Sequence, residues 1–221
     1  MHQGATRRIG GLALIASAVA LAAGSILASP GANSLEAFRA LTLPTLSPWL
    51  MALAGLLWIG GAVVLTRQFN GSAAEGWAAL AYAGALFGGV GLFLAGALGV
   101  YGVTGLATGT IFDHVNEAYT ALSYTSFAVG LMGIAAYYAG VTLFGVAMVR
   151  TPGWPAWLGW SGVAVGAAVV LLHATGLNFT MGAVAMALYM LGLVWVAAAG
   201  WHLRDREAAP AAAPPRAVPV P

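Results

Sequence analysis

Long apolar stretches without a charged residue recur along this sequence, and they constrain its fold more than any other feature. One of them runs from Gly76 to Phe112 without Asp, Glu, Lys or Arg. Uncharged apolar runs of about eighteen residues or more are the signature of membrane-spanning helices. Only 6% of the residues are charged, against about a quarter in soluble domains. The sequence therefore predicts an all-α polytopic membrane protein.

Turn and capping residues divide the apolar sequence into six expected spans. The expected spans are residues 10–29, 48–66, 76–101, 119–149, 157–175 and 179–201. Residues 1–203 are thus expected to form one six-helix transmembrane domain. Residues 204–221 are rich in Ala and Pro and should form a disordered cytoplasmic tail, because they have too few apolar side chains to build a core.

The first apolar run has two interpretations. Arg7 and Arg8 precede it, as in the basic region of a signal peptide, and small residues lie near Ala28. However, the run is long for a signal peptide, and Pro30 would follow the cleavage site closely. We therefore expect a retained first helix, with a cleaved signal peptide as the alternative.

The positions of the arginines predict the orientation. If the N-terminus is cytoplasmic, seven arginines fall on the cytoplasmic side and only Arg39 on the outer side. The seven are Arg7, Arg8, Arg67, Arg150, Arg204, Arg206 and Arg216. Both termini are therefore expected to be cytoplasmic. The composition suggests a bacterium, so the expected location is the bacterial inner membrane, as a multi-pass protein.

The third and fourth expected spans carry small residues at helical spacing. Gly88 in the third and Gly130 in the fourth are examples, and such faces let two helix backbones approach closely. We expect these two helices to pack against each other. Besides the lipid bilayer, other membrane proteins or a second copy could use similar faces, whereas so few charges make no patch for nucleic acid.

The candidate site lies on the outer side and is formed by Asp113, His114, Glu117 and His173. His114 and Glu117 are three residues apart and share a helix face. Imidazole and carboxylate groups could bind a divalent metal, and a haem between His114 and His173 is a weaker alternative. The competing interpretation is structural: Asp113 caps a helix and Glu117 lies in its first turn, where the helix dipole favours an anion. No cofactor is expected.

The expected spans contain no Asp, Glu, Lys or Arg. Such residues mark proton relays and ion paths in membranes, so an ion-coupled pump is disfavoured. No phosphate-binding loop, nucleophile elbow or zinc-protease motif occurs. The leading hypothesis is a non-enzymatic membrane protein, either an accessory partner or a small carrier of apolar molecules. The alternative is a membrane enzyme, or a metal- or haem-binding protein, with an outward-facing histidine and carboxylate site.

An acidic loop precedes the expected fourth helix, which contains Gly130-Leu131 and Gly145 and has Arg150 at its end. The fifth helix opens with the run Pro155-Ala156-Trp157-Leu158-Gly159-Trp160-Ser161-Gly162. In these features residues 5 to 203 resemble a family of small bacterial six-helix membrane proteins that is classified as a domain of unknown function. The resemblance implies the six-helix fold and no activity.

Overall fold

The computed structural model describes residues 2–27, 46–103 and 115–205, and every regular element in these ranges is a helix. The long helices are α1 (His2–Leu27), α3 (Leu46–Thr66), α4 (Glu75–Ala97), α6 (Val115–Val149), α7 (Ala156–Ala174) and α8 (Gly182–Asp205). Short helical turns are η1 (Arg67–Phe69), η3 (Leu177–Phe179) and the π-helical η2 (Leu98–Val103), which continues α4. Within these ranges, six helices are long and apolar enough to cross a membrane, as the sequence predicted.

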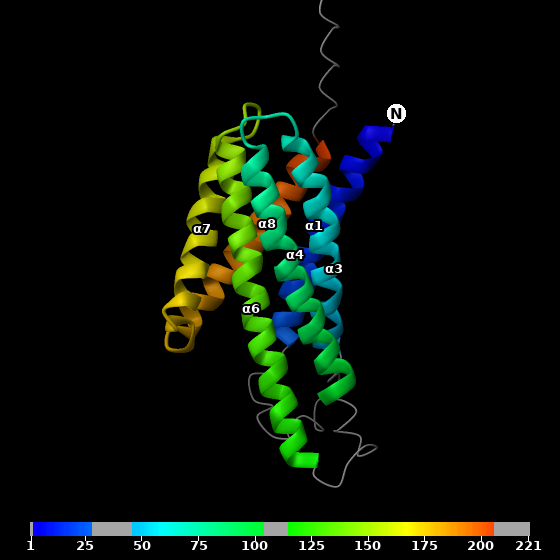
Figure 1. Ribbon diagram of the computed structural model, residues 1–221, viewed down its shortest axis with the longest axis vertical. Coiled ribbons are helices and arrows are strands. Elements are labelled where there is room, and N and C mark those ends of the chain that lie inside the picture. Colours follow the sequence, from blue (N-terminus) through cyan, green and yellow to red (C-terminus); the bar gives the residue numbers. More distant parts are fainter. Residues whose placement is uncertain (1, 28–45, 104–114, 206–221) are drawn as a thin grey trace, which may run out of the picture.

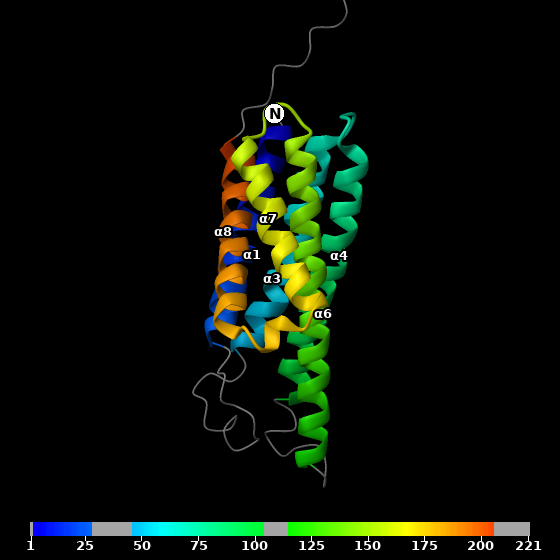
Figure 2. The same cartoon turned by 90° about the vertical axis from the view of Figure 1, so that its left-hand side faces the viewer.

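The six helices form a closed ring in chain order (Figures 1 and 2). Each packs against the next along the chain, and α8 returns to pack against α1. Around the ring, α4 and α6 associate most closely, whereas α7 and α8 associate least closely although a tight turn joins them. We call the junction between these two helices the α7–α8 seam.

Glycines explain the close packing of α4 on α6. A Cβ atom added at Gly88 would lie 2.5 Å from the backbone nitrogen of Tyr137, and one added at Gly91 would lie 2.6 Å from the Cα atom of Gly133. The expectation that these helices pack through small residues is thus confirmed. Gly130 differs from the expectation, because a Cβ atom there would meet Ala95 Cβ at an ordinary 3.5 Å.

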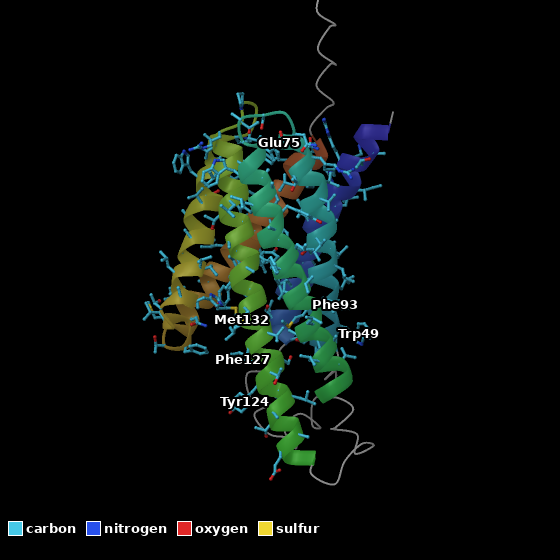
Figure 3. All side chains as sticks on the ribbon, in the orientation of Figure 1. Trp49, Glu75, Phe93, Tyr124, Phe127 and Met132 are labelled. Carbon is cyan, nitrogen blue, oxygen red and sulfur yellow. The ribbon has the colours of Figure 1, made fainter. Side chains whose placement is uncertain are left out.

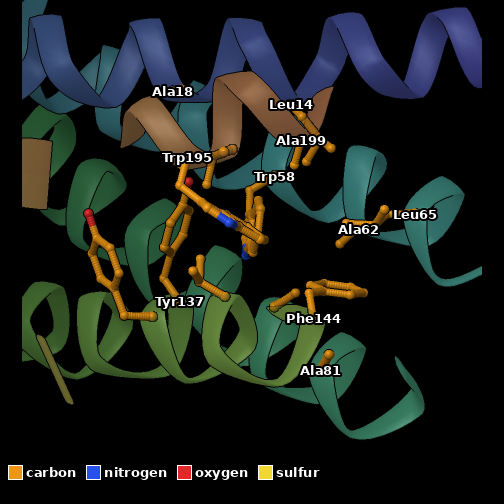
Figure 4. Packing of buried hydrophobic residues seen from close by; sticks show 14 of the residues in the cluster. Leu14, Ala18, Trp58, Ala62, Leu65, Ala81, Tyr137, Phe144, Trp195 and Ala199 are labelled. Carbon is orange, nitrogen blue, oxygen red and sulfur yellow. The ribbon is translucent and has the colours of Figure 1, made fainter. Parts of the chain in front are cut away.

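Aromatic side chains fill the middle of the ring (Figure 4). The ring of Trp58 on α3 stacks on Tyr137 of α6 at a centroid distance of 4.2 Å. Phe144, two turns further along α6, meets the same indole edge to face at 6.3 Å. All three side chains are fully buried. The ring therefore encloses a packed aromatic core.

Two helix starts differ in detail from the capping expected of the sequence. The sequence Ser47-Pro48 is typical of a helix start that the serine hydroxyl caps, but α3 already begins at Leu46 and the Ser47 hydroxyl donates to Gly24 O of α1 at 2.8 Å. Ser72 and Glu75 have the spacing of a capping box at the start of α4, but Glu75 accepts from the N–H of Gly71, at 2.9 Å. The hydroxyl of Ser47 thus joins two helices instead of satisfying its own.

The helix α6 is much longer than its neighbour α7. With 35 residues against 19, the two helices extend about 52 Å and about 28 Å at 1.5 Å per residue. Figure 2 shows the start of α6 and the end of α4 projecting past the turn between α7 and α8. Phe127 on α6 lies level with that turn, since its ring is 6.4 Å from that of Phe179.

Candidate functional site

The structure describes two of the four predicted site residues. Asp113 and His114 lie outside the described residues. Glu117 is exposed in the first turn of α6, and His173 is half-buried in the last turn of α7.

Glu117 and His173 lie at different depths along the bundle, although the sequence predicted that both belong to one site. Glu117 precedes Phe127 by ten residues, which corresponds to about 15 Å of helix rise. Phe127 is itself level with Phe179, beyond the end of α7. Within the described part of the chain, no contact joins Glu117 to His173.

Both ring nitrogens of His173 have partners. Nδ1 lies 2.9 Å from the carbonyl oxygen of Val169, one turn earlier on α7. Because a carbonyl can only accept, Nδ1 carries the proton, and in the neutral ring Nε2 is then an acceptor. The hydroxyl of Tyr189 on α8 donates to it at 3.3 Å. This pair of side chains crosses the α7–α8 seam.

Tyr138 extends this polar contact towards the core. Its hydroxyl donates to the backbone oxygen of Tyr189 at 2.6 Å, and the two phenol rings stack at 6.0 Å. Tyr138 in turn lies 5.2 Å from Tyr137, which stacks on Trp58. A continuous row of aromatic rings therefore leads from His173 near the end of the bundle to its centre.

A second hydrogen bond crosses the same seam. The indole N–H of Trp195 on α8 donates to Leu158 O on α7 at 2.6 Å. Gly162 makes room for this indole, because a Cβ atom there would lie 2.6 Å from it. Two aromatic side chains of α8 thus join it to α7 by hydrogen bonds, where the helices themselves pack least closely.

The arrangement at His173 can serve as one ligand of a metal. An imidazole whose Nδ1–H is held by a backbone carbonyl has Nε2 in the form that metals bind, although a metal here would have to displace the Tyr189 hydroxyl from Nε2. In the ranges 2–27, 46–103 and 115–205, however, no three His, Cys, Asp or Glu residues cluster as a metal site requires. The predicted metal set of Asp113, His114, Glu117 and His173 stays a prediction.

Hydroxyl-bearing side chains within membrane spans commonly join helices by hydrogen bonds, and the structure divides those of this chain into two groups. Tyr138 and Ser126 do join helices, since Ser126 donates to Ala95 O on α4 at 2.9 Å. Thr142 instead donates to Tyr138 O within its own helix at 2.9 Å. The pairing of Tyr189 with His173 was not predicted. The sequence feature that could have indicated it is the position of Tyr189, two turns into α8, the long helix that follows α7.

Comparison with protein families, with curated proteins and with solved structures found no match to this chain. The resemblance to a six-helix family therefore remains an expectation.

Proposed function

We propose that this chain is a non-enzymatic protein of the bacterial inner membrane that binds a small apolar molecule from the bilayer at the α7–α8 seam. Six apolar helices support the membrane location. Both termini would be cytoplasmic, because the up-and-down order of the helices gathers the described arginines at one end of the bundle (Figure 1). These are Arg7, Arg8, Arg67, Arg150 and Arg204.

The observation that carries the proposal is the contact between Tyr189 and His173 across the seam. Polar side chains within membranes are costly unless paired, and they mark functional positions. Both residues are half-buried, so they lie between the packed core and the surface that would face lipid. The loosest junction of the ring therefore contains a hydrogen bond between two polar side chains.

The filled core favours binding from the side over passage through the middle. Trp58, Tyr137 and Phe144 occupy the centre of the ring and are fully buried. A molecule dissolved in the acyl chains could reach the seam without displacing them. The role of a small carrier or accessory protein for apolar molecules follows from this lateral site.

The hydrogen-bond directions indicate which head group the site would favour. The Tyr189 hydroxyl uses its proton for His173 Nε2, which leaves the lone pairs of its oxygen to accept. A ligand that donates fits without rearrangement. We therefore infer an apolar molecule with a hydroxyl group.

The proposal is tested by purifying the protein in mild detergent and identifying the apolar molecules that it retains by mass spectrometry. Tyr189→Phe removes the hydroxyl and keeps the ring. The control is Tyr124→Phe, since Tyr124 is 71% exposed on α6 (Figure 3). One lost hydrogen bond of about 0.5–1.5 kcal/mol should lower the retained hydroxylated molecule roughly two- to tenfold in Tyr189→Phe. Equal retention by both variants, or no selective retention by the wild type, would contradict the proposal.

A further inference from the structure

We call the end of the bundle at which the five described arginines lie the arginine end. Two of these arginines lie over tryptophan rings. The Cζ atom of Arg150, just after α6, is 5.2 Å from the ring centroid of Trp77 on α4. The Cζ atom of Arg204 on α8 is 3.7 Å from the ring of Trp201. Both are cation–π contacts, which hold a guanidinium group over a ring face.

The two arginines differ in whether their charge is neutralised. Arg204 Nε donates to the carboxylate of Asp205 at 2.8 Å. Arg150 makes no ion pair within the part of the chain that the structure describes, and its cation–π contact leaves its five N–H groups free to donate. Arg150 therefore keeps an uncompensated positive charge, whereas the charge of Arg204 is paired with Asp205.

Aromatic contacts hold the turns at the arginine end together. Phe69 of η1 stacks on Trp154, in the turn after α6, at 5.6 Å, and Trp154 meets His202 of α8 at 5.1 Å. The nearby carboxylate of Glu75 is engaged by the N–H of Gly71. The turns that follow α3 and α6 are thus held together by aromatic contacts next to Arg150.

The charge at this end is strongly one-sided. Its described residues include five arginines against the two carboxylates of Glu75 and Asp205. An apolar side chain adjoins the Arg150 contact, since Leu80 is one turn beyond Trp77 on α4 and is exposed. A ligand here would meet a cation, an indole and an apolar surface in succession.

We propose that Arg150 and Trp77 bind the phosphate group of an anionic phospholipid at the junction of α4 and α6. The guanidinium fork matches phosphate oxygens in two parallel hydrogen bonds, and tryptophan favours the level of the lipid head groups. Basic sites between helices on the cytoplasmic side bind such lipids. The acyl chains would then cover Leu80. This inference rests on the membrane location given under the proposed function, and it does not involve the seam.

The experiment measures binding of phosphatidylglycerol to the protein in neutral detergent by native mass spectrometry. Arg150→Gln should weaken binding roughly tenfold or more, because charge-assisted hydrogen bonds are lost. Arg150→Lys keeps the charge without the fork and should fall in between. Arg204→Gln is the matched control: it removes a guanidinium group that lies over a tryptophan but is already paired with Asp205, so binding should stay within about twofold.

The lipid source is tested with phosphatidylcholine and with glycerol phosphate. Phosphatidylcholine should bind much more weakly, and glycerol phosphate without acyl chains should not compete. Equal effects of Arg150→Gln and Arg204→Gln would overturn the proposal, as would full competition by glycerol phosphate, which would indicate a site for a free anion. Tyr189→Phe should leave this binding unchanged, so failure here is distinguishable from failure of the seam proposal.

Discussion

At the scale of single residues, Trp195 shows how a polar atom is accommodated inside an apolar bundle. Its indole is almost fully buried and donates to Leu158 O at 2.6 Å. The ring fits because Gly162 on α7 has no side chain at that point. Tryptophan therefore contributes both packing and the hydrogen bond that joins α8 to α7.

Replacing Trp195 by Phe should destabilise the protein by about 1–3 kcal/mol, because the smaller ring leaves space and the hydrogen bond to Leu158 is lost. The free energy of unfolding in mixed detergent micelles measures this. Trp160→Phe is the control, since Trp160 is 61% exposed and should change stability by no more than about 0.5 kcal/mol. Equal stability of the two variants would mean that the contact with Leu158 contributes little.

The sequence predicted where single residues lie better than what they contact. His173 was expected near the end of its helix, and it is. Its partner Tyr189 lies 16 residues later, and the contact depends on how far α8 is rotated about its own axis. Apolar periodicity cannot fix that rotation in a helix that is apolar on all sides.

At the scale of helices, the pair α4 and α6 shows which glycines matter. Small residues on both helices predicted the pairing, but not which of them lie at the crossing. Gly88 meets the Tyr137 backbone directly, whereas Gly130 lies opposite a Cβ atom at an ordinary distance. The crossing point is set by the fit of whole surfaces, which the spacing of small residues leaves open.

Gly88→Ala and Gly130→Ala should therefore change stability in opposite directions. Gly88→Ala forces the backbones apart and should cost about 1–3 kcal/mol. Gly130→Ala fits its surroundings and should stabilise by about 0.4–1 kcal/mol, because alanine loses less conformational freedom on folding. Thermal unfolding of the purified variants compares them. The same loss at both positions would show that the helices cross elsewhere.

At the scale of the whole molecule, closure of the ring brings the two ends of the domain together. A Cβ atom added at Gly200 on α8 would lie 2.6 Å from Gly11 O on α1. Short connections favour contact between successive helices, so the order of the ring follows from the sequence. The contact between α1 and α8 joins residues far apart in the chain, and nothing local in the sequence predicts it.

We propose that the ring spans a membrane with the arginine end facing the cytoplasm. The chain has no cysteine, so single cysteines can be introduced without background. Ala73→Cys lies in the turn before α4 at the arginine end, and Thr180→Cys lies just after η3 at the opposite end. Both positions are exposed.

The decisive measurement is labelling of these two variants in intact spheroplasts with a maleimide that does not cross membranes. We expect labelling of Thr180→Cys in intact spheroplasts, and labelling of Ala73→Cys only after lysis, because the arginine end should remain on the cytoplasmic side. Labelling of Ala73→Cys alone before lysis would reverse the orientation. Equal labelling of both before lysis would contradict a membrane-spanning ring.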